Sequence, residues 1–250
     1  VSRVALATQG RRAIASSTLG KLEASIGVSI GPDVVADRTL ALPIEVDAGG
    51  GRRTVEGQPL FPSTPRALMS TADPVTADLA RAINFGAPGA LVVGKLGPRV
   101  TFSALVETTP QAALISSAIA MNDPTPRTVM ESYQPAGVPQ ILAGRLSGEL
   151  ASAYPDGQPQ VPLDSDPAIA ALQREERAKV EPYVSRSQGQ ADIIFVADSD
   201  AFEDAFYINP GTNAPIADNA AFILNALDNL GGDEALMALR SRAPAARPME

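Results

Sequence analysis

Apolar and polar residues follow one another along this chain with two different periods, one typical of strands and the other of helices. Residues 99–108 place an apolar side chain at every second position, which predicts a strand with one buried face. Residues 193–197 begin with four large apolar residues in succession, which predicts a strand in the sheet interior, covered on both faces. Further strands are expected at residues 3–8, 40–46 and 138–150. Pro43 places the second of these at the edge of a sheet, because proline cannot donate to a ladder.

Two early helices are indicated by capping residues and apolar spacing. Residues 17–27 have leucine and isoleucine at helical spacing and end at Gly27, where a helix favours a left-handed residue. A second helix is expected over residues 73–83. Asp73 can cap it, and Pro74 would occupy the first helical position, where a missing N–H has no consequence.

The C-terminal half predicts three more helices. Asp166 is expected to cap a helix that runs toward Tyr183, with Ile169 and Leu172 near one apolar stripe. Residues 218–230 and 233–240 are expected to form two successive helices joined at a glycine pair. In the first of them Asp218 would be the cap, and Phe222, Leu227 and Leu230 would point inward. Arg240 and Arg242 would end the second, facing either solvent or anionic lipid head groups.

Glycine and proline mark the irregular segments. Residues 47–65 contain three successive glycines beside two arginines, and a phosphate-cradling loop and a flexible loop are the two interpretations. We favour the flexible loop, because the spacing of phosphate-binding motifs is missing. Residues 123–137 are interpreted as a connector. The whole chain, 1–250, is interpreted as a single α/β domain containing a mixed sheet with a β-hairpin excursion. Two lobes joined by a linker near 153–167 are the alternative.

Composition narrows the classes of function. The chain has 250 residues, of which 45% are hydrophobic and 19% charged, which is enough to bury a sizeable core. Its net charge is −8. Nucleic-acid binding needs a basic footprint that displaces counterions from phosphates, so we expect no nucleic-acid partner.

The sequence contains no histidine and no cysteine. Nucleophilic catalysis by Ser-His-Asp or Cys-His is thereby excluded, because no imidazole is present to take the proton. The usual zinc, haem and iron–sulfur sites are excluded as well, since they need thiolate or imidazole ligands. Carboxylate chemistry, an Mg²⁺ or Ca²⁺ ion held by acids, or no catalysis at all remain. We expect a protein that is not an enzyme and that has no cofactor and no resident metal.

The longest run without charge or proline, residues 111–122, is well short of the roughly 20 apolar residues that a membrane-spanning helix needs. The chain begins at Val1 and ends at Glu250. We interpret it as a piece excised from a longer, membrane-anchored protein.

Three stretches together resemble one family. They are residues 27–51, residues 73–79, and the block that begins IIFVADSDAFEDAFYI at Ile193 and continues through DNAAFILNALDNLGGDEALMALRSR to Arg242. The pattern resembles the extracytoplasmic domain of auxiliary components of gliding-motility-type ABC transport systems. These in turn resemble intraflagellar-transport-like α/β domains related to the glutamine-amidotransferase fold.

The resemblance implies a Rossmann-like or amidotransferase-like three-layer sandwich in a bacterial envelope protein. It implies a place on the extracytoplasmic, periplasmic face of the inner membrane. The partners it implies are ABC transporter membrane subunits or other envelope components. The related enzymes use a Cys-His pair, and both residue types are missing here, so the resemblance implies a non-catalytic relative.

A cluster of acids follows the 193–197 strand and supplies the candidate ligand-facing residues, namely Asp198, Ser199, Asp200 and Asp204. If the chain stays extended, the first two acids point to one side and share a divalent cation through oxygen ligands. In the alternative interpretation, which we favour, they end the strand and begin the next helix, where the helix dipole favours negative charge. The two resulting functions are a non-enzymatic accessory domain that binds a partner protein or an envelope polymer, and a metal-dependent hydrolase or sugar-binding protein.

Overall fold

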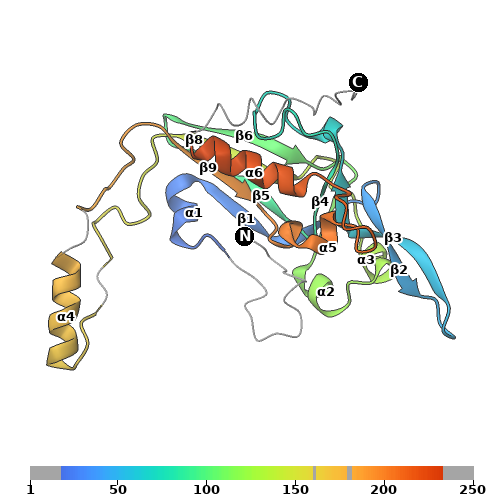
Figure 1. The fold of residues 1–250 in the computed structure, drawn as a ribbon, viewed down its shortest axis with the longest axis horizontal. Helices are drawn as coiled ribbons and strands as arrows, with labels where there is room; N and C mark the ends of the chain where they lie inside the picture. Colours follow the sequence, from blue (N-terminus) through green and yellow to red (C-terminus); the bar gives the residue numbers. More distant parts are fainter. Residues whose placement is uncertain (1–17, 160–161, 179–181, 233–250) are drawn as a thin grey trace, which may run out of the picture.

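The computed structural model describes residues 18–159, 162–178 and 182–232. The predicted strand at 3–8 and the predicted helix at 233–240 lie outside these residues. Two three-stranded sheets form the centre of the molecule (Figure 1). The β1 sheet has the strand order β5 (Gly89–Val93), β1 (Val28–Ala36), β7 (Ala113–Ile115). The β8 sheet has the order β6 (Val100–Glu107), β8 (Ile141–Gly148), β9 (Ala191–Val196).

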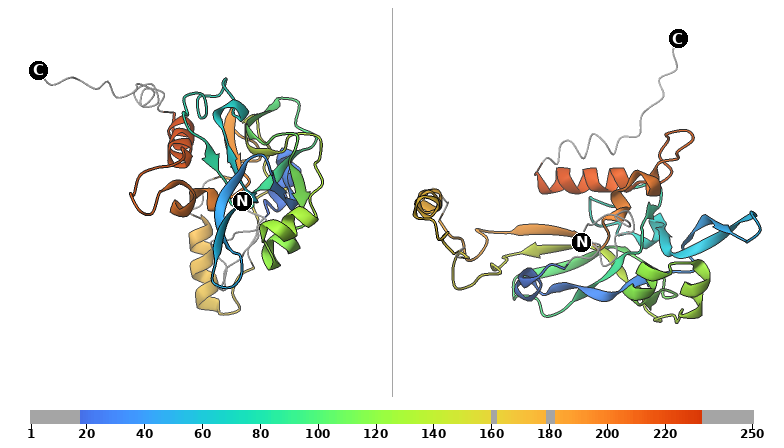
Figure 2. Two further views of the ribbon diagram at one scale, coloured as in Figure 1. Left: turned by 90° about the vertical axis from the view of Figure 1, so that its right-hand side faces the viewer. Right: turned by 90° about the horizontal axis from the view of Figure 1, so that it is seen from below.

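The β8 sheet lies between the β1 sheet and helix α6 (Asn219–Leu230), as the right-hand view of Figure 2 shows. Phe195 packs in a cluster with Ile30 and Leu91 of the β1 sheet. The next residue, Val196, packs instead against the cluster that contains Phe222 of α6. The alternation of side chains along a strand thus buries β9 from both sides, as its apolar run predicts.

The position of β9 within its sheet differs from the prediction. Among the described residues it pairs with β8 alone and stands last in the strand order, so it is an edge strand and not an interior one. All six ladders of the described chain are antiparallel, so these residues do not form the expected mixed sheet. An edge strand whose two faces are covered by different layers has apolar residues at successive positions, as a central parallel strand does. The mixed α/β content itself is confirmed.

The expected hairpin excursion is present. Strands β2 (Ala41–Asp47) and β3 (Arg53–Thr64) project from the body, and β3 also pairs with the short β4 (Ile83–Asn84) (Figure 1). The expectation of a flexible loop over residues 47–65 was therefore wrong for most of its length. Only the turn at its start is a loop, where the three glycines 49–51 adopt φ values of +82°, +63° and +74°. The expectation that residues 40–46 form an edge strand is confirmed, because β2 pairs only with β3 in the described chain.

Several of the shorter helices follow their sequence signals. Helix α1 (Lys21–Ile26) ends at Gly27, whose φ of +73° is the left-handed conformation expected there. The predicted connector 123–137 contains a helix, α3 (Pro126–Glu131), whose cap is the side chain of Thr125. The remaining short helices are α2 (Ser117–Asn122), α5 (Asp204–Tyr207), and the 3₁₀ turns η2 (Arg66–Leu68) and η3 (Asp200–Phe202).

Helix α4 (Pro167–Ala178) is carried away from the body on an arm between β8 and β9 (Figure 1). Asp166 caps it as predicted, with Oδ1 accepting from the Ala168 N–H at 2.8 Å. The apolar stripe does not face a core, since Ile169 is 45% exposed and Leu172 is 63% exposed. On α6, Phe222 is buried as predicted, whereas Leu227 and Leu230 are exposed.

Candidate functional site

The acidic turn begins where the two central sheets meet. Ala197 follows β9 and is fully buried. Its N–H donates to Leu142 of β8 at 2.9 Å, and its carbonyl accepts from the Gly89 N–H at the start of β5 at 2.8 Å. The residue thereby connects the β8 sheet with the β1 sheet, and the next residue, Asp198, is fully buried as well.

Asp198 is a buried carboxylate that organises the backbone around it. Its Oδ2 accepts from the Gly86 N–H at 2.5 Å, and its Oδ1 accepts from the Asp200 N–H at 2.9 Å. Burial raises the pKa of Asp198 to about 7, from an ordinary value of 3.8, because the charged form loses its hydration. The charge of Asp200 raises it as well, and the two N–H groups oppose both effects.

The four candidate residues differ in how far they are exposed to solvent. Asp198 and Asp200 are buried, whereas Ser199 and Asp204 are exposed. Asp204 accepts a hydrogen bond from the Tyr207 hydroxyl at 2.9 Å, and this bond raises the pKa of Tyr207. Within residues 18–159, 162–178 and 182–232, no group of three acids is arranged to hold a metal ion. Asp198, Asp200 and Asp204 therefore do not form such a group.

Two asparagines that the sequence analysis missed complete the turn. The amide oxygen of Asn219, at the start of α6, accepts from the Asn84 N–H at 3.0 Å. Its amide nitrogen donates to the carbonyls of Asn84 and Ala201 at 2.7 and 2.6 Å. Gly86 lies against the turn so closely that a Cβ there would come within 2.5 Å of the Phe206 ring. Isolated asparagines and a glycine carry no spacing signal, so no pattern in the sequence could have indicated this network.

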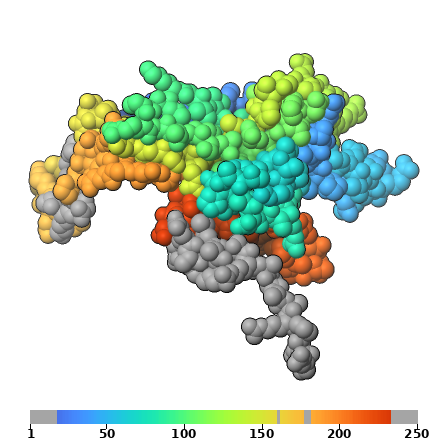
Figure 3. Space-filling view, turned by 90° about the horizontal axis from the view of Figure 1, so that it is seen from above, coloured from blue at the N-terminus to red at the C-terminus, as the bar shows by residue number. Residues whose placement is uncertain are grey.

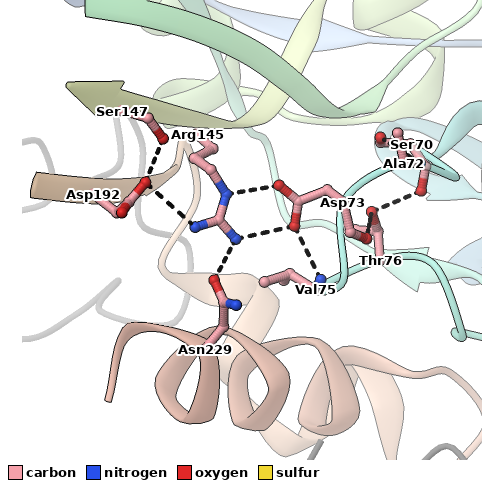
Figure 4. Close-up of polar contacts among 9 residues, drawn as sticks. All are labelled: Ser70, Ala72, Asp73, Val75, Thr76, Arg145, Ser147, Asp192 and Asn229. Carbon is pink, nitrogen blue, oxygen red and sulfur yellow. Dashed lines mark hydrogen bonds and ion pairs between the residues drawn. The ribbon is translucent and has the colours of Figure 1, made fainter. Parts of the chain in front are cut away.

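A second polar cluster lies between β8 and helix α6 (Figure 4). Arg145 binds both carboxylate oxygens of Asp73, with Nε to Oδ2 at 2.6 Å and Nη2 to Oδ1 at 3.0 Å (Figure 4). The same Nη2 donates to Asn229 of α6 at 2.6 Å, and Asp192 of β9 lies 3.7 Å from Nη1. The hydrogen bonds to Asp73 raise the pKa of Arg145 above its ordinary value. One guanidinium thus connects β8, β9, α6 and the segment that contains Asp73.

Residues 74–78 form turns and not the expected helix, and Ile83 belongs to β4. The Asp73 carboxylate accepts from the Val75 N–H at 2.9 Å, as a cap would, but both of its oxygens are also bound by Arg145. Asp218 is a second predicted cap whose carboxylate binds another segment of the chain. It stands at the start of α6 but makes no cap bond there, and its Oδ2 accepts from the N–H groups of Ala80 and Arg81. The single charge inside the apolar run of β8 was the one sequence signal for this cluster.

A groove of about 410 Å³ lies beside the segment that Asp73 anchors. One wall is formed by residues 67–72 and the other by the end of β6 and the residues after it. The lining combines polar groups with apolar residues, and the apolar ones include Leu68, Met69, Leu105, Pro110 and Pro139. Glu107 is the one charged residue in the lining. Its carboxylate is half-buried and has no hydrogen-bond or ion-pair partner among the described residues.

The fold and these sites define a mixed α/β domain whose buried carboxylates are engaged in hydrogen bonds within the fold. A comparison with protein-family models matched residues 4–226 to the auxiliary family described as an ABC-type uncharacterized transport system. Because the match covers most of the chain, the protein belongs to this family. Searches of the curated proteins and of the solved structures found no significant match.

Membership of this family indicates an auxiliary component of a transport system, associated with transporter components, and favours a role without catalysis. Such a role fits a protein of the cell envelope. None of the helices in the described part of the chain is both long and apolar enough to cross a bilayer.

Proposed function

We propose that this chain is the non-enzymatic, extracytoplasmic domain of an auxiliary component of a bacterial ABC-type transport system of the gliding-motility kind. In this role it binds a partner protein or an envelope polymer. The observation that carries the proposal is the family match over residues 4–226. The sequence supports the absence of catalysis, because it has neither an imidazole nor a thiol to act as base or nucleophile.

The shape of the molecule supports a binding role. The α4 arm and the β2–β3 hairpin extend from opposite ends of the body (Figure 1). Val55 on the hairpin and Leu172 on the arm are 65% and 63% exposed. Ile169 adds a second exposed apolar side chain one helical turn from Leu172, and contiguous exposed apolar patches mark surfaces that meet other macromolecules.

We also retain the relation to the three-layer sandwich of amidotransferases as a prediction about the fold. The succession of α6, the β8 sheet and the β1 sheet supports three layers. A mixed sheet needs at least one parallel pair, and every described ladder is antiparallel. An experimental structure that includes residues 1–17 would test this relation.

Cysteine labelling tests the location. These 250 residues contain no cysteine, so Val55→Cys and Leu172→Cys each add one thiol to this chain at an exposed position, and the full-length protein without either substitution is the labelling control. In intact spheroplasts that express the full-length protein, both thiols should react with a membrane-impermeant maleimide. Labelling that appears only after lysis would contradict an extracytoplasmic domain.

Crosslinking tests the partnership. The full-length protein is crosslinked in its native membrane, and the linked peptides are identified by mass spectrometry. Crosslinks to the membrane or ATPase subunits of an ABC transporter are expected. Crosslinks to none of these subunits would contradict the proposal.

A further inference from the structure

The first observation concerns the outer edge of β6. This strand is the last in the order of the β8 sheet, and between Thr101 and Ala104 its backbone bonds only to β8 within the described residues. Further along the same strand, the Ser70 N–H donates to the Leu105 carbonyl at 2.9 Å, and Met69 forms an antiparallel bridge with Val106. An extended segment of this chain thus already pairs with β6 at one end, and the edge continues beyond that segment.

The second observation is that residues 100–104 of this edge lack the features that usually protect edges. Natural sheets interrupt exposed edges with proline, charged residues or bulges, because an open row of N–H and C=O groups pairs with other strands. The β2 edge contains Pro43, and the β9 edge contains Asp192. Residues 100–106 of β6 contain neither a proline nor a charge. The register shift in β6 lies at its far end, between Ala104 and Glu107.

The third observation is the groove beside this edge. Its lining includes the half-buried Leu68 and the exposed Pro110 and Pro139, so it offers apolar contacts to side chains of an added strand. The half-buried Glu107 carboxylate lies in the same lining without a partner in the described chain. A carboxylate in partly apolar surroundings favours a cation as its neighbour. Figure 3 looks onto the side of the molecule where β6, in green, forms part of the surface.

We propose that the outer edge of β6 and this groove bind an extended segment of a partner protein, which adds a strand to the β8 sheet and places a lysine or arginine beside Glu107. The inference rests on the proposed function, because it assigns the surface through which the auxiliary domain meets its transport partner. Main-chain hydrogen bonds supply the affinity in this mode of recognition, and side-chain contacts in the groove supply the specificity.

A second copy of this chain fits the surface less well. If two β6 strands paired antiparallel about the centre of residues 101–104, Glu107 of each copy would lie opposite Pro98 of the other. The nearest cation of the other copy would be Arg99, whose guanidinium already binds Glu149 at 2.5 Å. The charge in the groove therefore favours a different, basic segment.

The test measures amide hydrogen exchange in the full-length protein, alone and after reconstitution with its ABC membrane and ATPase subunits. Exchange should slow within residues 101–104 and 70–72 on assembly. Glu107→Lys should weaken assembly about tenfold, because it places a positive charge against the partner's cation. The matched control is Glu131→Lys on α3, an exposed position outside the edge and the groove, where the same charge change should alter affinity by about twofold or less.

The other outcomes each overturn the proposal in a distinguishable way. Assembly with unchanged exchange in β6, or with equal effects of the two charge reversals, refutes this surface and leaves the auxiliary function intact. Slower exchange that appears in the protein alone as its concentration rises assigns the edge to contact between two copies. Failure to assemble with any transport subunit refutes the proposed function and this inference together.

Discussion

The buried ion pair between Asp73 and Arg145 should be the polar contact that matters most for the stability of this fold. The two side chains are only 9% and 13% exposed, and they are joined by two hydrogen bonds of 2.6 and 3.0 Å. The substitution Asp73→Asn keeps the shape of the side chain and removes its charge. The Arg145 guanidinium then stays in the interior without its main counterion.

Removing one partner of a buried pair costs about 3–5 kcal/mol, because the other charge is left uncompensated. Two contacts reduce the loss here. Asn229 still accepts from Arg145 at 2.6 Å, and the Asp192 carboxylate lies 3.7 Å away. We therefore expect a loss of about 3 kcal/mol in the free energy of unfolding, near the lower end of that range. For a protein of this size, each kcal/mol lowers Tm by about 2–4 °C, so Tm should fall by about 6–12 °C.

Urea and thermal unfolding, followed by circular dichroism, measure this loss. The control is Glu45→Gln in the surface pair Arg53–Glu45, which has a similar distance of 2.7 Å but side chains that are 77% and 63% exposed. It should cost less than about 1 kcal/mol. The double variant Asp73→Asn/Arg145→Met should lose less stability than the sum of the single variants, since no buried charge is left unpaired. Equal losses for Asp73→Asn and Glu45→Gln would refute the reasoning.

Three further predictions follow from the acidic turn and the arm. The folded pKa of Asp198, about 7, lies above its ordinary 3.8, so its contribution to stability is complete below pH 3.8 and is lost as the pH rises through 7. Between pH 5 and pH 8 the free energy of unfolding should fall by about 2–3 kcal/mol through this group. Urea unfolding of Asp198→Asn should therefore depend less on pH than that of the wild type, and equal pH dependence of the two proteins would contradict the prediction. Gly86→Ala should lower the free energy of unfolding by about 1–3 kcal/mol in the same assay, because the added methyl group meets the Phe206 ring. A urea midpoint equal to that of the wild type would show that the ring moves aside. Leu172→Glu on the arm should change the free energy of unfolding by no more than about 0.5 kcal/mol, and a larger loss would mean that α4 packs against the body.

Local signals predicted the elements that are stabilised locally. Gly27 ends α1 and Asp166 begins α4, because both act through their own backbone or that of the next turn. The alternation in β6 and the apolar run in β9 also predicted strands, since each pattern reports which faces are covered. The run in β9 could not show whether the strand is central or at an edge, because ladder partners leave no trace in a strand's own side chains.

Long-range contacts account for what the sequence did not predict. Asp73 carries every sign of a helix cap, but a guanidinium 72 residues away in the sequence binds its carboxylate. Within the acidic turn, the sequence indicated Asp198 correctly as a strand end and gave no indication of its burial. That burial depends on Gly86 and Asn219, which come from other parts of the chain. That the acids of this turn face a ligand remains a hypothesis.

The arm that carries α4 leaves and re-enters the body at neighbouring points. Gly148 pairs with Ala191, and just beyond them Ala151 forms a bridge with Arg186, so β8 and β9 are the two strands of a hairpin and the arm is its connecting loop. The entropy of closing a loop grows only slowly with its length, by about 0.6 kcal/mol for each doubling. The length and helical content of this loop can therefore change between related proteins with little effect on the rest of the fold. Evolution could alter what the arm reaches while the two central sheets and the acidic turn stay the same.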